Sequence, residues 1–336
     1  MPRLSLNVAV ETLTLSAPFR ISGYVFETSD VIVVTLSDGE HRGRGEGSGV
    51  FYLHDDVPHM LAAIEGARAS IEAGPSREEL RSILPPGGAR NAVDAALWEL
   101  EAQRAGKPVW ALAGLDQPRP LVTTFTLGAD TPEVMAAGAC RYADARSIKI
   151  KLTGELDLDI ARVNAIRAAR PDVWLGVDGN QGFGIADLDA LVAAMQTANV
   201  SLIEQPLARG READLDGYKS PIPLAADESA LSLTDVGTVA ARFDVFNIKL
   251  DKCGGLTEAL MIATAARAAG LGVMVGNMVG TSLAMAPGYV LGQLCDIVDL
   301  DGPTFLKQDR VPGVEYREGM VSCDDKVWGA DAMIAA

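Results

Sequence analysis

The chain has 336 residues, 48% of them hydrophobic, and a formal net charge of −16. This length supplies one large domain or two smaller ones, and the excess of acidic residues disfavours nucleic acid and anionic membranes as partners. The chain has only three histidines, which argues against a histidine zinc site, and its four cysteines are too widely spaced for a cysteine metal site. It has no apolar run of roughly 20 residues, which argues against a membrane span.

The first third of the chain predicts an α+β domain. Residues 4–15 and 30–39 alternate or are β-branched, and SDGEHRGRGEG between strands indicates a hairpin turn. The glycines of GRGEGSG open no helix, so we interpret them as a flexible loop and not as a nucleotide-binding motif. Helical periodicity follows in three segments, each ended by Gly or Pro: 57–74, 76–84 and 89–106. The N-terminus carries no long apolar core, so no signal peptide is expected, and reduced cysteines favour the cytoplasm.

From residue 121 onward, short apolar runs alternate with helical segments. Eight runs occur, and from the second onward their polar ends lie 22 to 28 residues apart, which is the length of a strand, its loops and a crossover helix. Eight parallel units close into a (β/α)₈-type barrel, with a six-stranded open sheet as the alternative. The predicted strands are 121–128, 147–151, 173–178, 200–204, 222–227, 244–249, 271–277 and 295–301.

The polar residues at the strand ends are the candidate site, because catalytic groups of such barrels lie at the C-terminal ends of strands. Asp178, Glu204 and Asp227 end three successive runs. Helix capping explains one or two such carboxylates, but not two lysine positions among four acidic ones. Three oxygen ligands without histidine or thiolate suit Mg²⁺, which would leave coordination positions open for a substrate carboxylate.

Lysines end two further runs, on the second and sixth strands. Lys151 and Lys249 would face each other across the mouth of the barrel, where two bases predict removal of a proton from the carbon next to a metal-bound carboxylate. Lys149 lies two residues before Lys151 and therefore on the same side of the strand. We expect Lys149 to lower the pKa of Lys151 by like-charge repulsion and to help bind the carboxylate.

These residues carry a resemblance to a known family. KIK, GVDGN, LIEQP, AADES, NIKLDKCGG and VDLDGPTF resemble the enolase superfamily in its muconate-lactonizing branch, and the likeness covers nearly the whole chain. The paired aspartates of VDLDGP are similar to those of the dipeptide epimerases, typified by L-Ala-D/L-Glu epimerase. Asp299 and Asp301 can also form a charge-assisted clamp for an ammonium group on physical grounds alone.

The resemblance implies a Mg²⁺-dependent isomerase that inverts the α-carbon of the second residue of an L-Ala-L-Xaa dipeptide. Lys151 and Lys249 would exchange the α-proton, and Asp299 and Asp301 would hold the free ammonium. It also implies a capping domain over residues 1–116, a barrel over 117–310 and a C-terminal segment, 311–336, that returns to the cap. Homo-oligomers are common among such enzymes.

The loop after APFRIS contacts the second residue of the substrate in this family. Where glutamate-specific members carry an arginine, this chain has SGYVFETS, with Phe26 at the corresponding place. We therefore expect a hydrophobic second residue to be accepted better than glutamate.

Two kinds of alternative function remain open from the sequence. Other enzymes on the same scaffold are o-succinylbenzoate synthase, N-acylamino acid racemase and muconate cycloisomerase, whose substrates lack a free ammonium. A barrel that binds a ligand without catalysis is the alternative of another class.

Overall fold

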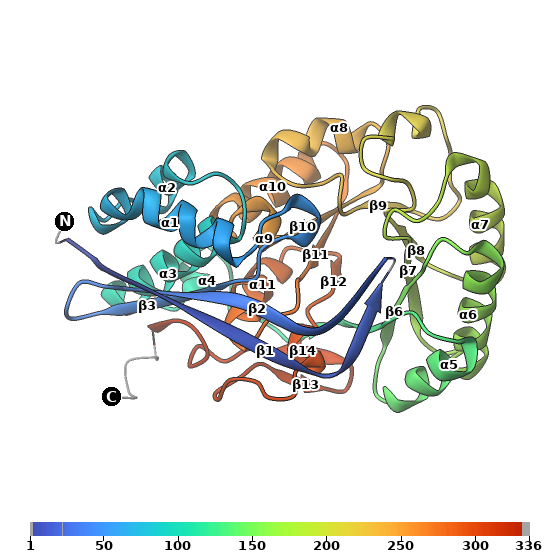
Figure 1. Cartoon of the computed structure of the whole chain (residues 1–336), viewed down its shortest axis with the longest axis horizontal. Helices are drawn as coiled ribbons and strands as arrows, with labels where there is room; N and C mark the ends of the chain where they lie inside the picture. The colour runs from blue at the N-terminus through green and yellow to red at the C-terminus, as the bar shows by residue number, and fades with distance from the viewer. Residues whose placement is uncertain (1–2, 22, 331–336) are drawn as a thin grey trace.

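A computed structural model describes residues 3–21 and 23–330 of the chain. Within these residues, no helix is both long and apolar enough to cross a membrane. The predicted (β/α)₈-type barrel with an N-terminal α+β cap is confirmed (Figure 1).

The cap begins with a three-stranded antiparallel sheet in the order β1-β2-β3. Its strands are β1 (Ser5–Ile21), β2 (Tyr24–Ser37) and β3 (Arg42–Gly47). The three predicted helices follow as α1 (Val57–Glu72), α2 (Arg77–Ile83) and α3 (Gly88–Ala105), and a short helix that was not predicted, α4 (Val109–Leu112), comes after them. In Figure 1 the long β1–β2 hairpin runs from the side of these helices toward the barrel strands. There the amide of Ala129 donates to the carbonyl of Arg20 at 2.9 Å, so the cap lies over the barrel mouth.

The prediction of a flexible glycine loop at GRGEG is wrong, because these residues form strand β3. A Cβ at Gly43 would lie 2.0 Å from the carbonyl oxygen of Ala96, and one at Gly45 would lie 2.1 Å from that of Ala92. Both carbonyls belong to helix α3. The glycines are therefore needed because the strand lies directly against the helix backbone, and not for mobility.

The barrel contains eight strands in the order β12-β11-β10-β9-β8-β7-β6-β5, and every paired neighbour is parallel. Eight strands exclude the six-stranded alternative. The strands are β5 (Thr124–Leu127), β6 (Ser147–Lys151), β7 (Trp174–Asp178), β8 (Leu202–Glu204), β9 (Leu224–Ala226), β10 (Val245–Lys249), β11 (Gly272–Gly276) and β12 (Ile297–Val298). The connecting helices are α5 (Pro132–Arg141), α6 (Leu156–Ala169), α7 (Ile185–Thr197), α8 (Val236–Ala240), α9 (Leu250–Cys253), α10 (Leu256–Ala268) and α11 (Ser282–Gly292). Short 3₁₀ turns are η1 (Phe51–Leu53), η2 (Glu212–Leu215), η3 (Leu233–Asp235) and η4 (Gly302–Phe305).

Side chains join the two edge strands of the barrel sheet, β5 and β12. The hydroxyl of Thr124 donates to Asp299, and the amide of Thr126 donates to Asp301 Oδ2 at 2.6 Å. Both aspartates follow β12. They therefore have a structural role at this seam in addition to any role in binding.

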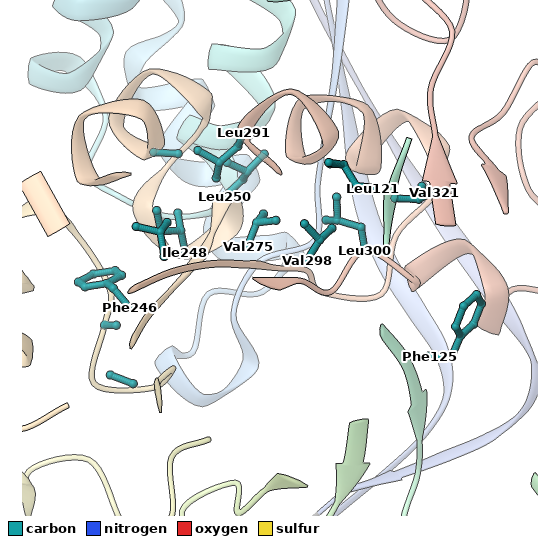
Figure 2. Close-up of a cluster of buried hydrophobic side chains, with 14 of the residues drawn as sticks. Leu121, Phe125, Phe246, Ile248, Leu250, Val275, Leu291, Val298, Leu300 and Val321 are labelled. Carbon is teal, nitrogen blue, oxygen red and sulfur yellow. The ribbon is translucent and has the colours of Figure 1, made fainter. Parts of the chain in front are cut away.

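One hydrophobic cluster runs from helix α3 through the barrel, and a second fills the cap between α1, α3 and the sheet. Figure 2 shows the part of the first cluster that lies between β10, β11, β12 and the helices outside them, including Phe246, Ile248, Val275 and Leu291. This packing fixes the strand ends on which the polar residues stand.

The C-terminal segment returns along the barrel toward the cap. Strands β13 (Glu315–Arg317) and β14 (Met320–Ser322) form a small antiparallel sheet with β4 (Leu121–Val122). Beyond it, the indole of Trp328 donates to the carbonyl of Arg44 on β3 at 3.1 Å.

Candidate active site

Strand β6 directs two charged groups into the mouth of the barrel. Lys149 and Lys151 alternate with Ile148 and Ile150, and side chains two residues apart on a strand lie on the same side. The isoleucines pack in the hydrophobic core, whereas both lysines line a cavity under the cap. The alternation of residues in SIKIK thus places the isoleucines in the core and the lysines in the cavity.

Three carboxylates meet at the ends of β7, β8 and β9. Asp178, Glu204 and Asp227 each offer one oxygen, and these oxygens lie within 4.8 Å of one another. Burial and the charge of Asp178 raise the pKa of Glu204 to about 7. Glu204 Oε2 also has no hydrogen-bond partner among the described residues. Acidic groups this close and this buried favour a bound cation, and the all-oxygen donor set fits Mg²⁺.

Two lysines flank the carboxylates. Lys151 Nζ donates to Asp178 Oδ2 at 2.6 Å, and Lys249 Nζ donates to Asp227 Oδ2 at 2.7 Å. Three strands separate β6 from β10 in the sheet order, so the two ammonium groups approach from opposite sides of an eight-stranded barrel. Burial opposes the charged form of Lys249, but Asp227 and Glu204 outweigh it and hold the pKa of Lys249 above its usual range. A cation bound by these two carboxylates would counter their effect and favour the neutral amine that a base requires.

Lys149 is paired with carboxylates. Its ammonium donates to Asp299 Oδ2 and lies 3.4 Å from Glu204 Oε2. Burial opposes the charge, but Asp299 and Glu204 prevail and raise the pKa of Lys149. The structure therefore shows Lys149 as a fixed cation beside Lys151, with its charge largely balanced by Asp299.

The predicted ammonium clamp, Asp299 and Asp301, shares Asp299 with this ion pair. Asp299 and Asp301 are each 2% exposed and line the cavity. Asp301 forms no ion pair with any described residue, and burial together with the charge of Asp299 raises the pKa of Asp301 to about 7. A cation brought by a ligand would stabilise the ionised form of Asp301.

Lys252 is a site residue that the sequence analysis missed. Its ammonium is fully buried and donates to Asp227 Oδ1 and to the carbonyl of Asp227, both at 2.6 Å, and to the carbonyl of Asn247 at 3.0 Å. Lys252 therefore contacts one carboxylate oxygen of Asp227 while Lys249 contacts the other. Its position in NIKLDK, three residues after Lys249, is a signal that could have revealed it.

The cavity above these groups has a volume of about 500 Å³. Phe26 lines it, as the sequence analysis expected, and four of the eight phenylalanines in the chain form part of its wall: Phe19, Phe26, Phe51 and Phe305. Among the described lining residues the only lysines or arginines are Lys149, Lys151 and Lys249, all three paired with carboxylates. Arg20 does not line this cavity. Its guanidinium Nη1 instead lies 3.6 Å from Asp130 Oδ2.

The cavity can therefore hold a small anion beside a divalent cation, with a lysine on each side. It can also hold an ammonium group beside Asp301, and an apolar group against the phenylalanines. The contributions of Phe19, Phe51 and Phe305 could not be read from the sequence, because they come from a strand and two 3₁₀ turns that meet only in the folded chain.

Known proteins share these sequence features. Residues 4–114 match the family described as mandelate racemase / muconate lactonizing enzyme, N-terminal domain, and residues 134–326 match the family described as enolase C-terminal domain-like. The L-Ala-D/L-Glu epimerase of Escherichia coli (strain K12) is 36% identical, over 94% of this chain and 98% of that protein. The N-acetyl-D-glutamate racemase of a Pseudoalteromonas species is also 36% identical, over 89% of this chain and 95% of that protein.

A solved structure shows a similar fold. It is the dipeptide epimerase from Enterococcus faecalis V583, complexed with Mg and the dipeptide L-Leu-L-Tyr. Its TM-score is 0.89 at 28% identity, and the match covers 96% of this chain and 97% of that chain.

Proposed function

The chain belongs to the enolase superfamily, and on this premise we propose that it is a Mg²⁺-dependent dipeptide epimerase that inverts the α-carbon of the second residue. The observation that carries this proposal is the arrangement of three buried carboxylates between two lysines from opposite strands, β6 and β10. An α-proton next to a carboxylate is very weakly acidic. Its removal needs both a base in contact and a positive charge beside the carboxylate.

Lys151 and Lys249 are the proposed acid and base. The lysine on one face of the substrate, as a neutral amine, accepts the α-proton. The lysine on the other face, as an ammonium group, donates a proton to the same carbon. The configuration is thereby inverted, and the two lysines exchange roles in the reverse direction. Their approach from opposite sides of the barrel is the geometry that this exchange requires.

Asp178, Glu204 and Asp227 are the proposed metal ligands. Mg²⁺ held there supplies the positive charge that stabilises negative charge on the substrate carboxylate. Lys252 fixes the orientation of Asp227 through its two 2.6 Å contacts with that residue. Lys149 Nζ lies 3.4 Å from Glu204 Oε2 and adds a further positive charge beside the proposed metal ligands.

Asp299 and Asp301 are proposed to bind the free ammonium of the dipeptide. Asp301 forms no ion pair with the described residues, whereas Asp299 would be shared between the substrate ammonium and Lys149. N-acylated amino acids lack this ammonium and would leave Asp301 without a cation. The acidic pair therefore favours a dipeptide over the substrate type of the N-acetyl-D-glutamate racemase.

We propose an apolar second residue. The side chain of that residue would lie against Phe26 and the other phenylalanines of the wall. Burial of apolar surface is favourable by about 25 cal/mol for each Å² removed from water. A glutamate carboxylate would instead be buried without a free cation, at a cost of several kcal/mol.

Two further proposals concern organisation. The cap, barrel and returning segment are divided at residues 1–116, 117–310 and 311–336. The location is cytoplasmic, where the four free cysteines would stay reduced.

A substrate panel tests the proposed function. With Mg²⁺ present, kcat/KM is measured for L-Ala-L-Leu, L-Ala-L-Phe, L-Ala-L-Glu and N-acetyl-L-leucine. We expect both apolar dipeptides to exceed L-Ala-L-Glu by at least tenfold and N-acetyl-L-leucine to react poorly. A higher kcat/KM for L-Ala-L-Glu contradicts the apolar preference alone. A higher value for N-acetyl-L-leucine contradicts the dipeptide assignment.

A further inference from the structure

Tyr52 is a cavity residue whose hydroxyl has no partner. It belongs to turn η1 of the cap and lines the same cavity as Lys151, Lys249 and Asp227. Its Oη is buried, yet it makes no hydrogen bond with any described residue. A buried hydroxyl without a partner costs about 1–3 kcal/mol. Such a group is therefore a strong candidate for a bond that forms only with a bound molecule.

The backbone around Tyr52 is held in a closed turn. The amide of Val50 donates to the carbonyl of Asp55 at 3.0 Å, and the amide of Asp55 donates back to the carbonyl of Val50 at 3.2 Å. The amide of Leu53 also donates to the carbonyl of Val50, at 2.9 Å. Three bonds across so few residues fix the position from which the Tyr52 side chain enters the cavity.

This turn is also attached to the barrel. The amide of Ser48 donates to Asp251 Oδ1 at 3.0 Å, and its hydroxyl donates to the carbonyl of Val279 at 3.2 Å. Asp251 follows Lys249 by two residues and is held in turn by Asn91 at 3.0 Å. The turn that carries Tyr52 is therefore positioned against the strand end that carries one of the two lysines.

The ring of Tyr52 packs edge-on against the ring of Phe51. The two ring centroids are 5.2 Å apart, and the interplanar angle is 86°. Tyr52 lines the cavity together with Asp227 and Glu228 at its metal end. Burial, followed by the charges of Asp227 and Glu228, raises the pKa of Tyr52 well above its usual value. The hydroxyl is therefore a neutral group that keeps its proton and can donate it in a hydrogen bond.

We propose that Tyr52 is a further catalytic residue, whose hydroxyl donates a hydrogen bond to the carboxylate of the second residue of the substrate. The inference rests on the proposed function. The substrate carboxylate is the group that belongs at the metal end of the cavity, and negative charge grows on it as the α-proton leaves. A fixed donor aimed at that charge is strengthened in the transition state more than in the ground state.

Two residues that line this end of the cavity, Asn180 and Glu228, carry a buried oxygen without a partner among the described residues, yet neither accepts a hydrogen bond from Tyr52. Asp178 and Asp227 accept from Lys151 and Lys249. Tyr52 would thus add a neutral donor from the cap to lysines and proposed metal ligands that come from the barrel, and catalysis would depend on the position of the cap turn.

The test compares two variants that each lose only a phenol hydroxyl. Tyr52→Phe removes the buried group, and Tyr218→Phe is the matched control, because the hydroxyl of Tyr218 donates to Asp189 Oδ1 at 3.0 Å and Tyr218 does not line the cavity. The readouts are kcat and KM for L-Ala-L-Leu, the Kd for Mg²⁺, and the Tm. We expect Tyr52→Phe to lower kcat about 100-fold, with KM and the Kd for Mg²⁺ changed less than threefold. Tyr218→Phe should remain within twofold of wild type.

Two outcomes overturn the inference while the proposed function stands. In the first, wild type epimerises L-Ala-L-Leu and Tyr52→Phe has the same kcat, so the hydroxyl has no catalytic role. In the second, Tyr52→Phe binds Mg²⁺ more weakly and regains full kcat at high Mg²⁺, so the hydroxyl serves the metal ligands instead of the substrate. A wild-type enzyme inactive on every dipeptide refutes the proposed function and this inference together.

Discussion

The ammonium clamp can be tested by changing one charge at its centre, with Asp299→Asn. In the structure, Asp299 is 2% exposed, pairs with the ammonium of Lys149 and accepts from the hydroxyl of Thr124. Asparagine keeps the shape of the side chain and loses the charge. The substrate ammonium would then retain Asp301 as its only charged partner in the clamp.

The magnitude follows from the type of bond that is lost. A hydrogen bond to a charged group contributes about 1.5–3 kcal/mol, and each 1.4 kcal/mol is tenfold, so kcat/KM for L-Ala-L-Leu should fall about 10- to 150-fold. Removing one partner of a buried ion pair also costs about 3–5 kcal/mol of folding free energy. That loss should be at the low end, because Glu204 Oε2 lies 3.4 Å from Lys149 as a second partner.

The assay compares two molecules that differ only in the ammonium group. Propionyl-L-leucine has the shape of L-Ala-L-Leu without the cation, so its inhibition constant should change less than threefold in Asp299→Asn. Asp157→Asn, at an exposed carboxylate near the start of α6, is the matched control and should alter neither value. Equal weakening of both molecules would show that Asp299 acts only through the fold, and the clamp would be refuted.

Three further predictions concern the bases and the fold. Lys151→Ala and Lys249→Ala should each abolish epimerisation, while each could retain slow α-proton exchange from one epimer only; full epimerase activity in either variant contradicts the two-base mechanism. Glu258→Gln breaks the buried 2.6 Å ion pair with Arg90 between barrel and cap, and should lower the free energy of unfolding by about 3–5 kcal/mol in urea titration; a loss below about 1 kcal/mol contradicts this. Burial raises the pKa of Asp94 to about 6. The protonated Asp94 therefore stabilises the fold below about pH 4, and the free energy of unfolding should fall by about 3 kcal/mol as the pH rises through 6. Asp94→Asn should flatten that part of the stability profile, and an unchanged profile contradicts the assignment.

The parts of the site that the sequence predicted are those set by the period of a single strand and by the rule that parallel strands end together. SIKIK places both lysines of β6 on the same side of the strand. The strands β7 to β10 end at or directly before the site residues Asp178, Glu204, Asp227 and Lys249. The regular spacing of all eight apolar runs predicted the eight-stranded barrel. These features depend on neighbours in the chain, so they can be read locally.

The parts that escaped prediction depend on contacts between distant segments. Lys149 and Asp299 are 150 residues apart, and only barrel closure brings them together, so the balancing of Lys149 by Asp299 has no local signal. The glycines of β3 looked mobile because the helix that lies against them follows some 45 residues later. Tyr52 stands in a short turn without periodicity, and its importance appears only when the turn is seen above the barrel mouth.

The central claim is that this site exchanges the α-proton of the second residue with the aid of Mg²⁺. The most direct measurement is ¹H NMR of L-Ala-L-Leu in D₂O with the Mg²⁺-loaded enzyme. The account predicts loss of the leucine α-proton signal, retention of the alanine α-proton signal and appearance of L-Ala-D-Leu. Exhaustive chelation should stop all three changes and added Mg²⁺ should restore them. Exchange that persists without metal, or a leucine α-proton that never exchanges in any dipeptide tried, would contradict the account.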